Sequence, residues 1–134
     1  MLDTDACIRF MNRSHPTLTE RVVSNPADVL CISIITAAEL TFGAERSARR
    51  AKNRERLREF RATIQTVAFD EVAVETYGSV RAELAAKGVV IGPLDLLIAA
   101  HAVSLEVTLV SSNLKEFGRV KRLRLEDWCA SVRA

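Results

Sequence analysis

Short apolar segments rich in β-branched residues alternate along this chain with longer segments of helical pattern. Residues 29–35 (VLCISII) form a continuous apolar run, and residues 107–111 (VTLVS) form a second one. Such runs are typical of parallel strands that are buried on both faces of a sheet. Residues 1–4 and 66–69 are shorter strand candidates, and residues 123–128 close the chain.

The segments between these strands predict helices. We expect them to begin and end near residues 5–12, 17–24, 36–48, 51–64, 71–87 and 92–105. Gly88 is a typical C-terminal stop, and Pro93 suits the first turn of the helix that it opens. Strands that alternate with helices predict a mainly parallel sheet covered on both faces. The expected fold class is α/β, a three-layer sandwich with a mainly parallel central sheet flanked by helices.

Length and composition indicate one folded domain over residues 1–134, with 49% hydrophobic and 27% charged residues. No apolar run approaches the roughly 20 residues that span a bilayer. Asp3 and Asp5 occupy the place where a secretory signal carries basic residues, so we expect a cytoplasmic protein without membrane contact. The three cysteines, Cys7, Cys31 and Cys129, are widely spaced in apolar surroundings and are expected to be reduced thiols.

Positive charge is concentrated locally, although the formal net charge is only +2. One basic segment carries Arg46, Arg49, Arg50, Lys52, Arg54, Arg56, Arg58 and Arg61. A second carries Lys115, Arg119, Lys121, Arg122 and Arg124. Such patches can contact a phosphate backbone, and they are equally compatible with a solvated helix face in which glutamates and arginines pair.

Three acidic residues stand in apolar surroundings that predict a core. Asp3 follows the first strand, Glu39 lies in IITAAELTFG, and Asp95 lies in IGPLDLLIAAHA. Burying a carboxylate costs on the order of several kcal/mol unless the carboxylate is paired or binds a cation. These three acids are therefore candidates for a functional site.

Each acid alone also has a structural interpretation. Thr36 and Glu39 have the spacing of a capping box, and Asp95 lies where a negative charge suits the helix dipole. Asp5 can cap the first helix. Asp3 differs because it lies at a strand end, with no predicted helix of its own to cap.

The three acids together indicate a metal site. If the strands are neighbours, Asp3, Glu39 and Asp95 meet at one edge of the sheet. Carboxylates that share a cleft raise each other's pKa unless a cation compensates their charge. Mg²⁺ or Mn²⁺ prefers carboxylate oxygens and leaves room for phosphate oxygens. The chemistry implied is metal-assisted hydrolysis of a phosphodiester.

The whole chain resembles the VapC-type toxins of the PIN-domain ribonuclease family. The resemblance is carried by six segments in the family order: MLDTDACI, ISIITAAELTFGAERS, YGSVRAELAAKG, IGPLDLLIAAHA, TLVSSNLKEFGRV and LRLEDW. It implies a PIN fold, Mg²⁺ or Mn²⁺ dependence, and endoribonuclease activity on structured RNA such as tRNA. It also implies a homodimer and a cognate VapB-like antitoxin within a type II toxin–antitoxin system.

The resemblance assigns the acids to family positions. Asp3, Glu39 and Asp95 fall on the first three metal-binding acids, and Glu39 could alternatively orient the attacking water as a general base. At the fourth acidic position this chain has Asn113 in place of an aspartate, and Glu116 is the nearest acid. Asp5 replaces the usual asparagine of the opening motif, where it can bind metal or cap the helix.

Other residues receive secondary roles. Thr4, Ser33, Ser111 and Asn113 could be polar neighbours of the metal ligands or contact substrate. Arg46, Arg49 and Arg50 correspond to the family's helical hairpin, where they could contact RNA, antitoxin or both. We expect His101 to be a core histidine and Trp128 to be a packing residue. The antitoxin is expected to lay an apolar helix in a groove and insert a basic side chain among the acids.

Two other functions remain open on the sequence. Asp3-Thr4-Asp5 also matches the start of haloacid dehalogenase-type phosphatases, but that class needs a later acidic pair, typically adjacent, and this chain has no Asp-Asp pair. A catalytically silent PIN-like scaffold that binds RNA or a partner is compatible with the absent fourth aspartate, although retention of the other three acids favours an enzyme.

Overall fold

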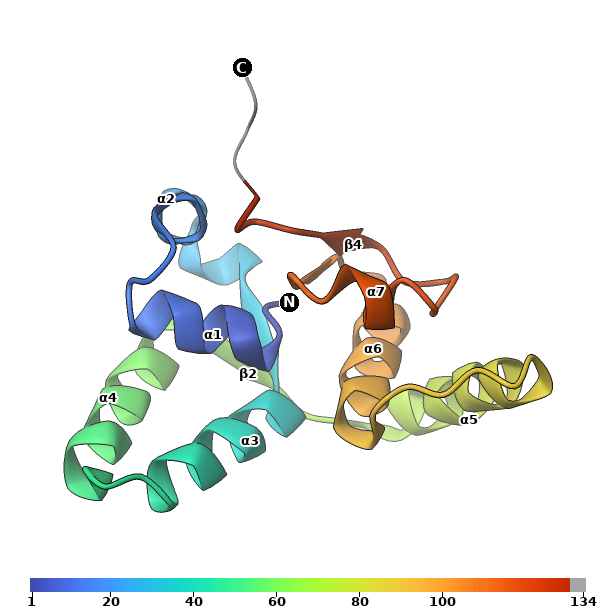
Figure 1. Ribbon diagram of the computed structural model, residues 1–134, viewed down its shortest axis with the longest axis horizontal. Helices are drawn as coiled ribbons and strands as arrows, with labels where there is room; N and C mark the ends of the chain where they lie inside the picture. Colours follow the sequence, from blue (N-terminus) through green and yellow to red (C-terminus); the bar gives the residue numbers. More distant parts are fainter. Residues whose placement is uncertain (131–134) are drawn as a thin grey trace.

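The computed structural model describes residues 1–130, which form helices around a small parallel sheet (Figure 1). The helices are α1 (Thr4–Met11), α2 (Pro16–Ser24), η1 (Ala27–Val29), α3 (Ile34–Glu45), α4 (Arg50–Thr63), α5 (Glu71–Ala86), α6 (Pro93–Leu105) and α7 (Leu114–Phe117). The strands are β1 (Cys31–Ser33), β2 (Gln65–Val67), β3 (Leu109–Val110) and β4 (Leu125–Glu126). The predicted α/β architecture is confirmed.

Leu2 joins two strand pairs into one sheet. β1 pairs with β2 and β3 pairs with β4, both in parallel. Leu2 forms parallel bridges to both Ile32 and Val110, so the order is β2, β1, Leu2, β3, β4. Its amide donates to the Cys31 carbonyl at 2.9 Å, and the Val110 amide donates to the Met1 carbonyl at 2.8 Å. The predicted strand at 1–4 is therefore a single fully buried residue that pairs on both sides.

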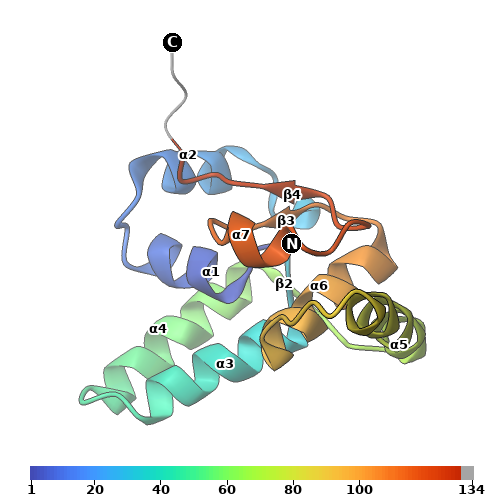
Figure 2. The same ribbon diagram turned by 45° about the vertical axis from the view of Figure 1, so that its right-hand side comes forward.

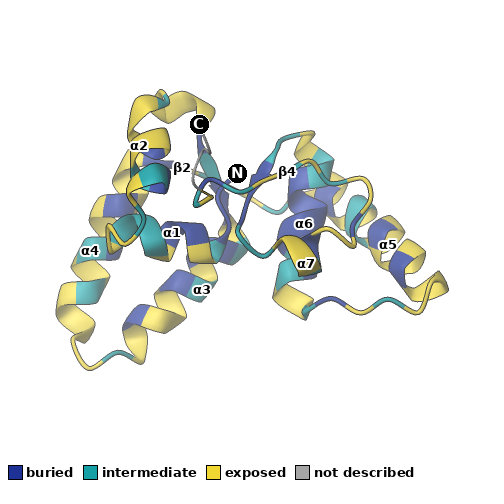
Figure 3. Ribbon diagram, turned by 45° about the horizontal axis from the view of Figure 1, so that its top comes forward, coloured by how far each residue is buried: buried dark blue, intermediate teal, exposed yellow. Residues whose placement is uncertain are grey.

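Two hydrophobic clusters fill the space on either side of this sheet. One joins α1–α4 and includes Leu18, Ile32 and Phe60, whereas the other joins α5 and α6 and includes Leu109 and Phe117. Figures 1 and 2 show the α3–α4 hairpin and the α5–α6 pair on opposite sides of the sheet. α6 is the most deeply covered helix (Figure 3). This arrangement places the N-terminus of α6 at the same edge as the start of α1.

Three sequence predictions about where helices begin and how they are capped are wrong. α1 begins at Thr4 and is capped by Asp3, so the expectations that Asp5 caps it and that Asp3 has no helix to cap are wrong. α3 begins at Ile34, with the Ser33 hydroxyl accepting from the Ile35 amide at 3.1 Å. Thr36 lies buried inside the first turn, so the predicted capping box with Glu39 does not form.

The end of α5 agrees with expectation. Gly88 has φ +65° just after α5, the left-handed conformation that glycine adopts at little cost. Cys7, Cys31 and Cys129 are free thiols. In residues 1–130 no helix is both long and apolar enough to cross a bilayer. η1 and α7 were not predicted from the sequence, because they are too short to show a clear periodicity.

Candidate metal centre

Five carboxylates lie around the carboxyl edge of the sheet, and we call them the acid cluster: Asp3, Asp5, Glu39, Asp95 and Glu116. Asp3 directly follows Leu2, between the ends of β1 and β3. Asp95 lies in the first turn of α6 and Glu39 lies in α3. Parallel strands place their carboxyl ends at one edge, so residues distant in sequence gather there.

Asp3 is held firmly by groups of its own helix and of β3. It is 4% exposed, and its Oδ1 accepts a hydrogen bond from the Ala6 amide at 2.7 Å. Burial raises the pKa of Asp3, while hydrogen bonds from the Ser111 side chain and the Ala6 amide act in the opposite direction. The carboxylate is thus oriented by donors but still lacks full charge compensation.

The other four acids of the cluster all repel the charge of Asp95. Its pKa is raised from 3.8 to about 6, first by burial and then by the charges of Glu116, Glu39, Asp3 and Asp5. All four other members therefore act on Asp95 electrostatically. A nearby cation would reverse this effect, because an opposite charge favours the ionised carboxylate.

Glu39, on α3, is held by a hydrogen bond from a threonine of α1. The Thr4 hydroxyl lies 2.7 Å from Glu39 Oε1 and 3.3 Å from the Thr36 hydroxyl. This contact joins the first turn of α1 to the middle of α3. It supports the predicted role of Thr4 as a polar neighbour of the acids.

Glu116 connects α7 to the start of α6. Its Oε1 accepts from the Gly92 amide at 2.5 Å, and its Oε2 accepts from Asn113 Nδ2 at 3.3 Å. The Gly92 hydrogen bond is the main cause that lowers the pKa of Glu116. A Cβ atom at Gly92 would lie 3.2 Å from Glu116 Oε1 and 3.5 Å from Asp95 Oδ2, so the acids approach this backbone closely. Asn113, which stands at the fourth acidic position, thus helps to orient the carboxylate of Glu116.

Ser33 and His101 form a buried pair behind the acid cluster. His101 Nδ1 lies 2.7 Å from the Ser33 hydroxyl, and the imidazole contacts the edge of Phe69 with ring centroids 5.2 Å apart. Burial lowers the pKa of His101 because it disfavours the charged imidazolium. His101 is 1% exposed and Ser33 is fully buried, so neither side chain lies at the surface.

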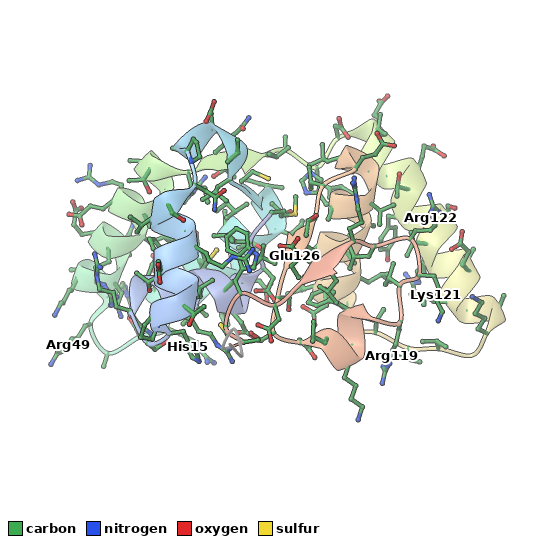
Figure 4. All side chains as sticks on the ribbon, turned by 90° about the horizontal axis from the view of Figure 1, so that it is seen from above. His15, Arg49, Arg119, Lys121, Arg122 and Glu126 are labelled. Atoms are coloured by element: carbon green, nitrogen blue, oxygen red, sulfur yellow. The ribbon has the colours of Figure 1, made fainter. Side chains whose placement is uncertain are left out.

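The arginines at the α3–α4 turn are exposed and lie apart from the acid cluster. Arg46 packs over Phe42 at 5.5 Å, and Arg50 Nε donates to the Glu45 carbonyl at 3.2 Å. Arg49 precedes α4 and projects outward (Figure 4). Trp128 is buried at the C-terminal segment and donates to Glu126 at 2.7 Å, in agreement with a packing role.

The donor set of the acid cluster fits a hard divalent cation. It consists of carboxylates, which Mg²⁺ and Mn²⁺ prefer, and it includes Asp95, whose pKa is raised by burial and by the charges of the other four acids. Across residues 1–130, no three His, Cys, Asp or Glu side chains are close enough to form a ready coordination group. Metal binding would therefore draw the side chains of Asp3, Glu39 and Asp95 together, which their mutual repulsion otherwise opposes.

Comparison with known proteins identifies the class of this fold and site. The PIN domain family model matches residues 1–123. The chain therefore belongs to the PIN-domain family, and its curated relatives place it in the VapC group of that family. It is 40% identical over 129 residues to the tRNA(fMet)-specific endonuclease VapC of Salmonella typhimurium, covering 96% of this chain and 97% of the relative. It is 37% identical over 131 residues to ribonuclease VapC2 of Rickettsia felis, with 96% of each chain covered.

Solved structures give the same result. The chain matches the structure of DNA-bound VapBC from Salmonella typhimurium with a TM-score of 0.92 and 40% identity. It matches VapBC2 from Rickettsia felis, bound to a promoter DNA fragment, with a TM-score of 0.87 and 35% identity. Both matches cover 96% of this chain and 97% of the other chain.

Proposed function

We propose that this protein is a divalent-metal-dependent endoribonuclease and the toxin of a type II toxin–antitoxin pair. The observation that carries the proposal is the acid cluster, in which burial and the charges of four neighbouring carboxylates raise the pKa of Asp95. The relatives support it, because proteins alike over nearly their full length are named as VapC ribonucleases. We expect it to act in the cytoplasm with Mg²⁺ or Mn²⁺.

In this proposal Asp3, Glu39 and Asp95 hold the metal. A bound divalent cation would polarise the phosphodiester and make water a stronger nucleophile at neutral pH. Asp3 is fixed for this task by the Ala6 amide, and Glu39 is oriented by Thr4. Glu39 can accept a proton from the attacking water if it does not contact the metal. Glu116, with both oxygens accepting hydrogen bonds, keeps the start of α6 and hence Asp95 in place.

The proposed substrate is a structured RNA, with tRNA as the first candidate. One relative is named as a tRNA(fMet)-specific endonuclease. The exposed arginines at the α3–α4 turn, including Arg46, Arg49 and Arg50, would bind the phosphate backbone beyond the cleavage point.

The proposed protein partner is a VapB-like antitoxin. A pocket of about 240 Å³ lies between α1, α3 and α4, and its lining includes Ile8, Met11, Leu40 and Leu57. Glu39 also lines this pocket, so a segment bound there reaches the acid cluster. An apolar helix with one basic residue suits such a groove. The related structures from Salmonella and Rickettsia are VapBC complexes.

We also propose that the toxin forms a homodimer through the α5–α6 side. Val90 is 78% exposed and Leu94 is 47% exposed, next to a pocket lined by Tyr77, Leu84 and Leu96. Covering such apolar residues is favourable, at roughly 25 cal/mol for each Å² removed from water.

RNA cleavage by the purified, antitoxin-free protein tests the proposed function. With Mg²⁺ or Mn²⁺, we expect discrete fragments from a total-RNA pool, and none when EDTA is added. Addition of Mn²⁺ should also raise the melting temperature, since a ligand that binds the folded state stabilises it by about 2.7 kcal/mol at 100 times its Kd. RNA that stays intact with folded, Mn²⁺-bound protein would favour the scaffold function instead.

The arginines at the α3–α4 turn give a separate prediction. The double change of Arg49 and Arg50 to alanine should weaken RNA or antitoxin binding, and the slope of log affinity against log salt should fall by about 1 to 2. Arg58→Ala is a matched control, since Arg58 in the same hairpin is already paired with Glu55 at 2.6 Å. Fluorescence anisotropy across a salt series measures both. An unchanged slope in the double variant would assign these arginines to solvated surface.

A further inference from the structure

Arg9 lies near the acids Asp3 and Asp5 and forms no salt bridge with either of them. Arg9 lies on α1, and its Nη1 donates to the Ser112 hydroxyl at 2.9 Å and contacts Cys129 Sγ at 3.5 Å. Both partners are uncharged groups of the C-terminal part of the chain. Arg9 belongs to neither of the two basic segments, and the proposed function gives it no role.

Three consecutive residues place Arg9 at the edge of the acid cluster. The side chain of Ser111 hydrogen-bonds with Asp3, that of Ser112 with Arg9, and that of Asn113 with Glu116. Neighbouring Cα atoms are about 3.8 Å apart, so the anchor of the guanidinium lies between the anchors of two acids.

The anchor of Arg9 is itself fixed. The Ser112 hydroxyl donates to Asp127 Oδ1 at 3.0 Å, and the Cys129 amide donates to the same oxygen at 2.9 Å. Asp127 thus ties together both groups that contact the guanidinium. An arginine that is oriented in advance loses less conformational entropy when it binds a ligand.

The guanidinium retains free donors. Within residues 1–130 no carboxylate oxygen lies within 4.0 Å of Arg9, in contrast to Arg21, Arg50, Arg54, Arg58 and Arg122. In the same range Nε and Nη2 have no hydrogen-bond acceptor. A guanidinium presents five N–H groups in a planar fork that matches two phosphate oxygens. Arg9 therefore has both the charge and the donors to bind a phosphate.

We propose that Arg9 binds an RNA phosphate adjacent to the scissile one and so positions the backbone over the acid cluster. The inference rests on the proposed ribonuclease function. A phosphate chain that approaches five carboxylates is repelled until metal binds, and a fixed cation at the edge gives it a favourable first contact. The competing structural role is a tether between α1 and the C-terminal segment.

Binding and cleavage of a labelled tRNA(fMet) transcript distinguish these roles. Arg9→Met keeps much of the side-chain length and removes the charge. Arg122→Met is the matched control, since Arg122 also donates to a serine hydroxyl, Ser79 at 2.9 Å, and lies on the α5 side away from Arg49 (Figure 4). Binding is measured by anisotropy in an Asp95→Asn background, so that the RNA stays intact.

For Arg9→Met we expect an affinity loss of about 10-fold near 0.1 M salt and a salt slope reduced by about 0.7 to 0.9, as for one lost phosphate contact. In the active background KM should rise about 10-fold, with a smaller change in kcat. Arg9→Lys should recover the salt slope but only part of the affinity, because lysine lacks the fork. Arg122→Met should stay within about twofold of its parent in both measurements.

Ser112→Ala tests the tether directly, because it removes the anchor and keeps the charge. If Arg9→Met and Ser112→Ala lower the melting temperature equally and neither changes RNA affinity or salt slope, Arg9 is only a tether and the proposal is overturned. Equal loss of affinity in Arg9→Met and Arg122→Met would overturn it as well. If wild type and Arg9→Met cleave the transcript with equal KM, the role proposed for Arg9 is overturned, while the proposed ribonuclease function stands. RNA left intact by the wild-type protein contradicts the proposed ribonuclease function and this role with it.

Discussion

Asp95→Asn is expected to abolish RNA cleavage while making the metal-free protein more stable. The raised pKa of Asp95, about 6, means that its charge is disfavoured in the folded state at neutral pH. The full shift from 3.8 would correspond to about 3 kcal/mol at 1.36 kcal/mol per pH unit. Asp95 is only partly buried, so solvent screening reduces this, and we expect a gain of about 1 kcal/mol in the free energy of unfolding. Cleavage should fall by more than about 100-fold, since even residues that only support metal ligands contribute 10–100-fold.

The pH dependence has a definite sign. Below about pH 4 Asp95 is protonated in both the folded and the unfolded state, so wild type and variant should unfold alike. Between about pH 4 and 6 the unfolded state loses the proton while the folded state keeps it, and wild type loses relative stability as pH rises. Above about pH 6 the difference should be constant. Urea unfolding in EDTA across pH 4–8 measures it, provided that both proteins unfold cooperatively.

Excess Mn²⁺ provides the control for this comparison. Metal should stabilise wild type and leave Asp95→Asn unchanged, which reverses their order. A variant that is less stable than wild type in EDTA at pH 7 would show instead that the charge of Asp95 mainly stabilises the N-terminus of α6 through the helix dipole.

The sequence predicted the architecture because its local signals agree with the fold. The apolar runs near residues 29–35 and 107–111 contain β1 and β3, and both strands are parallel and buried. Pro93 opens α6 and Gly88 follows α5, where their backbone preferences act locally. The strands themselves are shorter than their apolar runs, because helix caps such as Ser33 end them early.

The first residues of the helices at the site were harder to predict, because a side chain there can both cap a helix and belong to the acid cluster. Asp3 follows a strand in sequence, but only the structure shows that this strand is one residue long and that Asp3 caps α1. Thr36 and Glu39 have capping-box spacing, yet the helix begins two residues earlier. Spacing alone could not decide between Ser33 and Thr36.

The long-range contacts of the site had no signal in the sequence. Apolar flanks singled out Asp3, Glu39 and Asp95, but nothing local indicates that Glu116 bonds to the amide of Gly92, 24 residues away. Arg9 and Ser112 are separated by 103 residues. Such pairs depend on how the sheet brings α1, α6 and α7 together, and they involve polar residues that are ordinary in their own segments.

The double role of Asp3 leads to the second large effect. Its carboxylate is an acid-cluster member, and the same group accepts the Ala6 amide hydrogen bond that starts α1. Asp3→Asn keeps an oxygen for this cap, whereas Asp3→Ala removes it. Both should lower cleavage by more than about 100-fold. Only Asp3→Ala should lose stability, by about 0.5–2 kcal/mol for the cap.

Asp3→Asn should match wild type or exceed it in metal-free stability, because burial raises the pKa of Asp3 and the amide carries no charge. Asp70→Ala is the matched control: Asp70 caps α5 by accepting from the Ala73 amide at 3.0 Å and is not in the acid cluster. It should lose similar stability and keep cleavage. Urea unfolding and RNA cleavage of the three variants measure both properties. If Asp3→Asn cuts RNA as well as wild type does, the cap is the whole function of Asp3, and the metal must be held by the other acids of the cluster.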